Sequence, residues 1–200
     1  MKITNVTLTL FAWNDIPATK YGQLSQEFSG TSQMGLVTIT TDQGIQGHAF
    51  LGSASRGANL DGQSLIDYLK PVVMGQDPLN RERLYQDLQK RYRNTTPRVI
   101  GAVDIALWDA ISKEAGLPLY RYAGGYREGQ VPAYASGGYY AEGKGPDDLA
   151  REMQSYVEMG FQAVKIKVGR VPPKEDAERV RAAREAVGPD VPVFLDANNA

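Results

Sequence analysis

The stretch Val164-Lys165-Ile166-Lys167-Val168 alternates apolar and basic side chains. In a β-strand, successive side chains point to opposite faces, so the two lysines share one face, roughly 6–7 Å apart, and the three apolar residues share the other. If helices cover the apolar face, the lysines point into a barrel interior or toward an opposite layer, where two ammonium groups are costly without an anion or a solvated pocket. On an edge strand, the same pair would form only a solvated surface. The alternation therefore indicates either a site for an anion or an exposed strand face.

A second strand-like stretch, Val193-Phe194-Leu195-Asp196-Ala197-Asn198, also becomes polar on one face at its C-terminal end. By the same alternation, Phe194, Asp196 and Asn198 share that face. In parallel α/β folds, active sites lie at the C-terminal ends of the strands, so these side chains and the two lysines are expected to meet there. A carboxylate suits a hard cation such as Mg²⁺. The alternative for Asp196 is a simple ion pair with a lysine.

The residues around these two stretches alternate between strand-like and helix-like patterns. Strands are expected over Val131–Ser136, Phe161–Val168 and Val191–Asp196, and helices over 146–159 and 174–187. Each connection is long enough to let the strands pair in parallel. The C-terminal part of the chain is therefore expected to be a β-α-β-α-β unit with a parallel sheet.

The N-terminal part begins with strands of a different arrangement. Alternating, β-branched runs predict strands over 3–11, 34–41 and 45–51, and the turn Asp42-Gln43-Gly44 joins the last two as a hairpin. The polar segment 14–32 is expected to be a loop. A loop of that length in a compact domain is usually functional or mobile.

Helical periodicity follows over 62–70 and 80–92, and most clearly from Pro97 to Gly116, where Thr96 is expected to cap the helix. Asp109, on the last of these helices, is expected to be a structural carboxylate. His48 is expected to be an ordinary strand residue.

The polar, glycine-rich residues 123–130 are the expected boundary between the two parts. The sequence thus predicts an α+β domain over 1–128 and a second domain over 129–200.

Composition excludes several classes of function. The 200 residues hold 22 basic and 23 acidic side chains, so the net charge of −1 attracts neither nucleic acid nor an anionic membrane. Because the chain has no cysteine, it has no disulfide, iron–sulfur or thiol chemistry, and its single histidine excludes a His-pair metal motif. No apolar run approaches the roughly 20 residues that span a bilayer, and no signal peptide is evident. We therefore expect a cytoplasmic protein without nucleic-acid or membrane partners.

Five short segments occur in an order that is found in a known enzyme family. They are Ala106-Leu107-Trp108-Asp109-Ala110, Gly116-Leu117-Pro118-Leu119-Tyr120, Ala123-Gly124-Gly125, Lys165-Ile166-Lys167-Val168-Gly169 and Leu195-Asp196-Ala197-Asn198. With these segments, the chain resembles the mandelate racemase branch of the enolase superfamily, in the mandelate racemase/muconate lactonizing enzyme family. The resemblance covers essentially all 200 residues.

The resemblance implies an α/β fold, with an N-terminal α+β capping domain followed by the first strands of a (β/α) TIM-type barrel. Family members have an eight-stranded barrel, whereas this chain stops after the third expected barrel strand. We therefore expect the chain to be the N-terminal part of a longer protein, with the remaining metal ligands beyond residue 200.

The same resemblance implies roles for four residues of the two decisive stretches. Asp196 matches the first of three carboxylate ligands of Mg²⁺, and Lys167 matches the base that removes a proton α to a carboxylate, through an enediolate. Lys165 matches a residue that helps to hold the substrate carboxylate, and Asn198 matches a contact to a substrate oxygen.

Three further residues are candidate substrate contacts by the same resemblance. Ser136, at the end of the first expected barrel strand, matches a polar contact on the substrate side. The segment 14–32 matches a family loop that closes over the substrate, and its candidates are Lys20 and Tyr21.

The implied reaction is a Mg²⁺-dependent dehydration of a sugar acid or racemisation of a hydroxy acid, by a homo-oligomer that binds a small carboxylic acid. Dehydration is favoured because the segment 14–32 is polar. The muconate-lactonizing and dipeptide-epimerase branch of the superfamily shares the Lys-x-Lys pair, so it is the alternative.

Two readings from other classes stay open. The stretch Gly138-Tyr139-Tyr140-Ala141-Glu142-Gly143-Lys144-Gly145 fits Gly-x4-Gly-Lys of a phosphate-binding loop, but it has glycine where Ser or Thr binds Mg²⁺. The other reading is a barrel that keeps the fold without catalysis.

Overall fold

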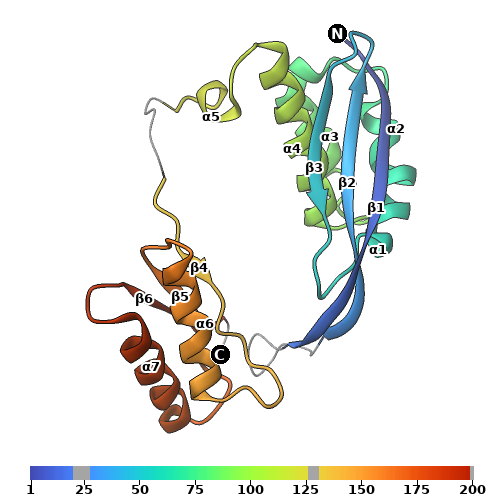
Figure 1. The fold of residues 1–200 in the computed structure, drawn as a ribbon. Helices are drawn as coiled ribbons and strands as arrows, with labels where there is room; N and C mark the ends of the chain where they lie inside the picture. The colour runs from blue at the N-terminus through green and yellow to red at the C-terminus, as the bar shows by residue number, and fades with distance from the viewer. Residues whose placement is uncertain (20–27, 126–130, 199–200) are drawn as a thin grey trace. The chain divides into compact units, whose positions relative to one another are not determined.

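The computed structural model describes residues 1–19, 28–125 and 131–198 (Figure 1). The chain forms two compact units, the first from Met1–Asn14 and Thr31–Glu128 and the second from Asp15–Gly30 and Gly129–Ala200. The predicted boundary between residues 128 and 129 lies outside the described residues, so that division stays a prediction. No helix of the described part combines the length and the apolar character needed to cross a bilayer.

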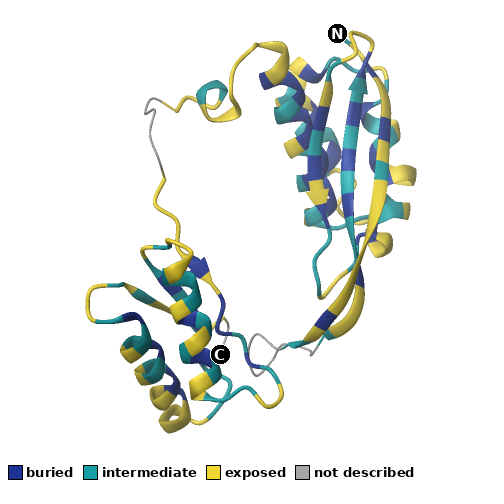
Figure 2. Cartoon of the chain, in the orientation of Figure 1, coloured by how far each residue is buried: buried dark blue, intermediate teal, exposed yellow. Residues whose placement is uncertain are grey.

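The N-terminal sheet has the strand order β1-β2-β3, with β1 at Ile3–Thr19, β2 at Phe28–Thr41 and β3 at Gln46–Leu51. The predicted hairpin is confirmed, because β2 and β3 pair antiparallel with Thr40 opposite Gln46. Buried positions alternate along the inner part of β2 (Figure 2).

The expected loop over 14–32 is wrong for the residues that the structure describes. Residues 14–19 continue β1, and residues 28–32 belong to β2. The prediction took a polar composition as a sign of a loop. Threonine and serine are nonetheless compatible with a strand whose faces are exposed to solvent, because β-propensity reflects the fit to a pleated surface more than polarity.

The helices of the first unit follow the sheet in the chain, and most of them pack apolar residues against one of its faces. They are α1 (Asn59–Ser64), the π-helical turn η1 (Leu65–Leu69), α2 (Lys70–Val73), the 3₁₀ turn η2 (Pro78–Asn80), α3 (Arg81–Gln89), α4 (Pro97–Glu114) and α5 (Leu119–Tyr122). The resulting core includes Val37 and Ile39 of β2 and Ile100, Val103 and Leu107 of α4.

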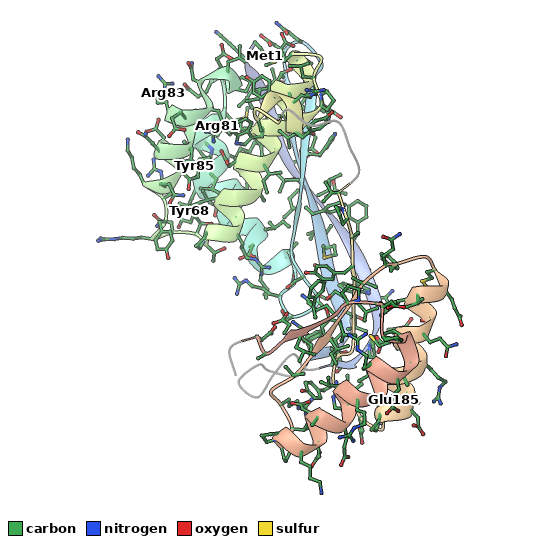
Figure 3. The ribbon with its side chains drawn as sticks, turned by 90° about the vertical axis from the view of Figure 1, so that its left-hand side faces the viewer. Met1, Tyr68, Arg81, Arg83, Tyr85 and Glu185 are labelled. Carbon is green, nitrogen blue, oxygen red and sulfur yellow. The ribbon has the colours of Figure 1, made fainter. Side chains whose placement is uncertain are left out.

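Two neighbouring helices of this unit are joined by a side chain of α3. Arg81, labelled in Figure 3, places Nη1 2.9 Å from Asp104 Oδ1 of α4. Its guanidinium lies 4.3 Å from the ring centroid of Trp108, also on α4. These contacts use the basic head and the flat face of one arginine to hold α3 against α4.

The sheet and α4 approach closely at Gly47 of β3. A Cβ atom placed there would lie 2.0 Å from the carbonyl oxygen of Ala106, so only glycine fits. Beside it, Asp109 Oδ2 accepts a hydrogen bond from the backbone N of His48 at 2.8 Å. The structural role expected for Asp109 and the strand position expected for His48 are therefore confirmed.

Helix α4 begins at Pro97, as predicted, but its predicted side-chain cap is wrong. Thr96 is the N-cap residue by its extended backbone, yet its hydroxyl makes no capping hydrogen bond, and Oγ1 is buried without a partner in the described structure. The sequence signal for a cap depends on residue type and position, and it does not specify the rotamer that the surrounding core imposes.

The second unit is a parallel sheet in the order β4-β5-β6, with two helices between its strands. The strands are β4 (Ala135–Ser136), β5 (Val164–Lys167) and β6 (Val193–Asp196), and the helices are α6 (Pro146–Glu158) and α7 (Pro173–Val187). The expected β-α-β-α-β order is confirmed (Figure 1). The first strand is shorter than expected over Val131–Ser136, because residues 131–134 lie outside the ladder.

Candidate active site

The lysine-bearing strand β5 presents two faces of opposite character. Val164 and Ile166 are fully buried and pack with Leu149 and Met153 of α6 in the core of this unit. The two lysines occupy the other face, which confirms the alternation expected from the sequence. The helices cover the apolar face, so the lysines point away from them.

The register of the sheet brings the predicted polar residues together. Lys165 lies between Ser136 and Phe194, and Lys167 lies beside Asp196. Because paired residues of parallel strands project to the same face, these five side chains share the face opposite the helices.

Both lysines converge on one carboxylate. Lys167 Nζ lies 2.6 Å from Asp196 Oδ2, and Lys165 Nζ lies 3.2 Å from the same atom. Lys167 Nζ also donates to Asn198 Oδ1 at 2.5 Å. The structure therefore brings together four of the predicted site residues. It also contains the simple ion pair that the sequence left as an alternative for Asp196.

Hydrogen bonds keep the Asp196 carboxylate ionised. Hydrogen bonds from Lys167, from the backbone N of Asn198 and from Lys165 hold the pKa of Asp196 far below its ordinary value. The carboxylate is therefore ionised at neutral pH. In return, the hydrogen bond to Asp196 raises the pKa of Lys165 above its ordinary value.

Asn198 reaches the cluster in a way that strand alternation did not predict. Strand β6 ends at Asp196, and Asn198 has a positive φ of 51°, in the left-handed region that asparagine tolerates better than most residues. Its backbone N donates to Asp196 Oδ1 at 2.9 Å. This tight turn carries the side-chain amide back to Lys167.

Aromatic rings surround the lysines, and the sequence analysis missed two of them. Lys165 Nζ lies 5.5 Å from the ring centroid of Tyr134, and Lys167 Nζ lies 5.8 Å from that of Tyr139. Tyr134 also meets Phe194 edge to face at 5.2 Å. Strand parity could have found Tyr134, which is two residues before Ser136, whereas Tyr139 lies past the end of β4 and gave no such signal.

The remaining predicted contacts are less informative. Ser136 lies next to Lys165 in the ladder and is exposed. Lys20 and Tyr21 lie outside the described residues. The roles of Ser136, Lys20 and Tyr21 as substrate contacts stay predictions.

A metal ion would find one clear ligand at this face. Within the ranges that the structure describes, no group of three or more His, Cys, Asp or Glu side chains could hold a metal ion. Mg²⁺ sites commonly combine one or two carboxylates with waters and substrate oxygens. The ionised Asp196 therefore fits as one ligand of such a site.

The structure does not support a phosphate-binding loop between β4 and α6. Lys144 Nζ lies 2.5 Å from Glu152 Oε2, and the other oxygen of Glu152 accepts from the backbone N of Gly138 at 3.2 Å. The backbone N of Gly145, at the start of α6, donates to Asp148 Oδ2 at 2.9 Å. Carboxylates occupy the positions at which phosphate oxygens would have to accept hydrogen bonds.

The sequence matches two family descriptions over most of its length. Residues 7–124 match the mandelate racemase / muconate lactonizing enzyme N-terminal domain, and residues 148–200 match the enolase C-terminal domain-like family. The chain belongs to the mandelate racemase / muconate lactonizing enzyme family. Its resemblance to the enolase superfamily, and the α/β fold with an N-terminal capping domain and the first strands of a barrel, are confirmed.

Relatives in this family differ in their reactions. The chain is 41% identical to an arabinonate dehydratase of Saccharolobus solfataricus over 66% of this chain and 36% of that protein. Two solved structures share its fold at a TM-score of 0.82. One is a mandelate racemase/muconate lactonizing enzyme-like protein of Rubrobacter xylanophilus, with 30% identity over 100% of this chain and 54% of that one. The other is a dipeptide epimerase of Enterococcus faecalis, complexed with Mg and the dipeptide L-Leu-L-Tyr, with 29% identity over 100% and 55%. The chain thus spans about half the length of these solved relatives.

Proposed function

We propose that the complete enzyme removes the proton α to the carboxylate of a small acid, with Lys167 as the base and with Mg²⁺ bound in part by Asp196. The observation that carries this proposal is the convergence of Lys165, Lys167 and the backbone N of Asn198 on the Asp196 carboxylate, at the C-terminal ends of β5 and β6. Active sites of parallel β/α barrels lie at that end of the strands.

Lys167 is the better placed of the two lysines to act as a base. It is the last residue of β5 and is 7% exposed, so its amine is held at the strand end and is largely shielded from water. A Mg²⁺ ion held in part by Asp196 would supply positive charge that stabilises the substrate carboxylate as the proton leaves. Lys167 Nζ lies 2.6 Å from Asp196 Oδ2 and 2.5 Å from Asn198 Oδ1, so these two side chains fix the position of the amine that we propose accepts the proton.

Lys165 is proposed to stabilise negative charge and not to accept a proton. Its pKa is raised by the hydrogen bond to Asp196, so the group is an ammonium at neutral pH. It lies one pleat deeper than Lys167, beside the ring of Tyr134. A fixed ammonium at this depth stabilises negative charge on the substrate carboxylate as the α-proton leaves.

For the substrate, we favour a sugar acid and therefore a dehydration. Support comes from the identity of 41% to an arabinonate dehydratase. Epimerisation of a dipeptide is the second candidate, because the dipeptide epimerase matches the whole chain at a TM-score of 0.82. Ser136, Asn198, Lys20 and Tyr21 are the proposed substrate contacts. A homo-oligomer and a cytoplasmic location stay predictions.

The proposal is tested by α-proton exchange. The complete enzyme is incubated in deuterated water with arabinonate, other sugar acids, hydroxy acids and hydrophobic dipeptides, with and without Mg²⁺. Nuclear magnetic resonance then measures deuterium at the α-carbon. We expect Mg²⁺-dependent exchange on one class of acid. Exchange at an equal rate after Mg²⁺ is removed by a chelator would contradict the proposal.

A further inference from the structure

A buried polar group lies against the C-terminal end of β5, on the helix side of the sheet. It consists of Tyr140, Asp176 and Arg179, which are 6%, 7% and 6% exposed. The hydroxyl of Tyr140 donates to Asp176 Oδ1 at 2.7 Å, and Arg179 Nε lies 3.4 Å from the same oxygen. The guanidinium of Arg179 stacks 4.2 Å from the ring centroid of Tyr140. The two charges are thus paired and shielded from water.

These three side chains hold the backbone directly after Lys167. The last ladder bond of β5 runs from the backbone N of Val168 to the carbonyl of Asp196, at 3.1 Å. Beyond Val168, the backbone N–H groups donate to side chains instead of to a neighbouring strand. The backbone N of Gly169 donates to Asp176 Oδ2 at 2.6 Å, and that of Arg170 donates to the hydroxyl of Tyr140 at 3.2 Å.

Arg179 completes the arrangement from the carbonyl side. Its Nη2 donates to the carbonyl oxygen of Gly138, in the connection after β4, at 2.9 Å, and to that of Lys167 itself at 3.4 Å. Gly138 has a φ of +62°, and a Cβ atom there would lie 2.7 Å from Cβ of Ile166. One guanidinium therefore joins the ends of two neighbouring strands at the residue that carries the amine.

We infer that Tyr140, Asp176 and Arg179 are positioning residues for Lys167, which fix the backbone from which its amine reaches the substrate. This inference rests on the proposed function of Lys167. A displacement of about 1 Å from the reactive geometry can lower a rate roughly 100-fold, so a base at a strand end depends on whatever replaces the ladder there.

The bonds made by Tyr140, Asp176 and Arg179 indicate a role beyond general stabilisation of the fold. Burial raises the pKa of Tyr140, so its hydroxyl stays protonated and donates to Asp176. Apolar residues of similar volume often replace a buried ion pair without loss of stability. Here, however, three of the bonds end on the backbone of residues 167, 169 and 170, where apolar side chains could not replace them.

The second unit contains a matched control. Tyr156 of α6 donates from its hydroxyl to Glu152 Oε1 at 2.9 Å, and burial raises its pKa to about 12. It therefore resembles Tyr140 as a tyrosine that donates to a carboxylate and whose pKa is raised by burial. Its carboxylate partner, Glu152, lies on α6 itself and not at the end of β5.

The experiment compares Tyr140→Phe with Tyr156→Phe in the complete enzyme with Mg²⁺. The probe is the acid that the wild type exchanges fastest among arabinonate, other sugar acids and hydrophobic dipeptides. For Tyr140→Phe, we expect kcat for α-proton exchange to fall roughly 10–100-fold, while KM and the Kd for Mg²⁺ by calorimetry change less than about twofold. Amide hydrogen exchange at Arg170 should also become faster. For Tyr156→Phe, kcat should stay at the wild-type value.

The outcomes distinguish this inference from the proposed function. If Lys167→Met is inactive and Tyr140→Phe keeps the wild-type kcat, the positioning role is overturned and the base assignment stands. An equal loss of kcat in both tyrosine variants would also overturn it, because it would indicate general destabilisation. If Lys167→Met exchanges at the wild-type rate, the proposed function itself fails. If Tyr140→Phe does not fold, Arg179→Lys, which keeps the charge but loses the planar guanidinium over the ring of Tyr140, is measured by the same criteria.

Discussion

Each of the two units contains an aspartate paired with lysine, in different surroundings. In the first unit, Asp109 Oδ2 lies 2.6 Å from Lys113 Nζ, and the side chain of Lys113 is 45% exposed. In the second, Asp196 Oδ2 lies 2.6 Å from Lys167 Nζ, and the side chain of Lys167 is only 9% exposed. Equal distances therefore describe one lysine at the surface and one that is nearly buried.

The number of cations differs as well. Asp109 receives Lys113 and the backbone N of His48, so one positive charge meets one negative charge and the bond joins β3 to α4. Asp196 receives two ammonium groups, which leaves an excess positive charge at the strand ends. A balanced pair serves to hold elements together, whereas an excess charge at the C-terminal ends of parallel strands is suited to an anionic substrate.

The largest effect is expected when the carboxylate of Asp196 is changed. In Asp196→Asn, the side chain keeps its shape but loses its charge, so we expect Mg²⁺ affinity to fall at least about 10-fold and turnover to fall roughly 1000-fold, or about 4 kcal/mol. Calorimetry with Mg²⁺ and α-proton exchange measure the two effects. Unchanged Mg²⁺ affinity in this variant would show that Asp196 is only an ion-pair partner of the lysines.

A second change addresses the structural character of the first unit. In Gly47→Ala, the new Cβ would overlap the carbonyl oxygen of Ala106, and β3 would have to move away from α4. We expect a loss of about 3 kcal/mol in the free energy of unfolding, from urea titrations, with kcat per folded molecule unchanged. Wild-type stability would mean that the approach of β3 to α4 is wrong.

A smaller effect is expected when the carboxylate of Asp109 is changed. Asp109→Asn keeps an oxygen for the backbone N of His48 and removes the charge opposite a half-exposed lysine. We expect a loss of about 0.5–1 kcal/mol in the free energy of unfolding and no change in Mg²⁺ affinity. A drop in Mg²⁺ affinity here would contradict the division between a structural carboxylate and a site carboxylate.

The pH dependence of stability gives the smallest signal. Because the pKa of Asp196 is lowered in the folded state, its stabilising contribution is present above the ordinary carboxylate range near about pH 4 and is lost as the pH falls toward the lowered value. Urea titrations of the wild type and of Asp196→Asn should therefore differ by a constant amount above about pH 5 and converge in acid. A difference that grows in acid would have the wrong sign for this pair.

The sequence was most informative where side-chain direction follows from backbone period alone. The alternation in β5 predicts that Lys165 and Lys167 share a face, and parallel pairing then places Asp196 beside Lys167. The loop expected at residues 14–19 and 28–32 and the cap at Thr96 were predicted wrongly, because polarity and residue type do not determine pairing with a neighbouring strand or a buried rotamer.

The rest of the site depends on tertiary structure that no short segment encodes. The turn at Asn198 needs a left-handed backbone, which composition permits but does not specify. Tyr140 and Arg179 are separated by 39 positions in the sequence, and only the packing of α7 beside the connection after β4 brings the ring and the guanidinium together. Contacts between residues so far apart produce no periodic pattern in the sequence.

The most direct test of the account is α-proton exchange in deuterated water by Lys167→Met in the complete enzyme with Mg²⁺. A general base typically contributes roughly 100- to 10,000-fold to a rate. We expect this variant to keep its fold by circular dichroism and its Mg²⁺ affinity, and to lose exchange on one face of the α-carbon by at least about 100-fold. Exchange of the same proton at the wild-type rate would contradict the assignment of Lys167 as the base.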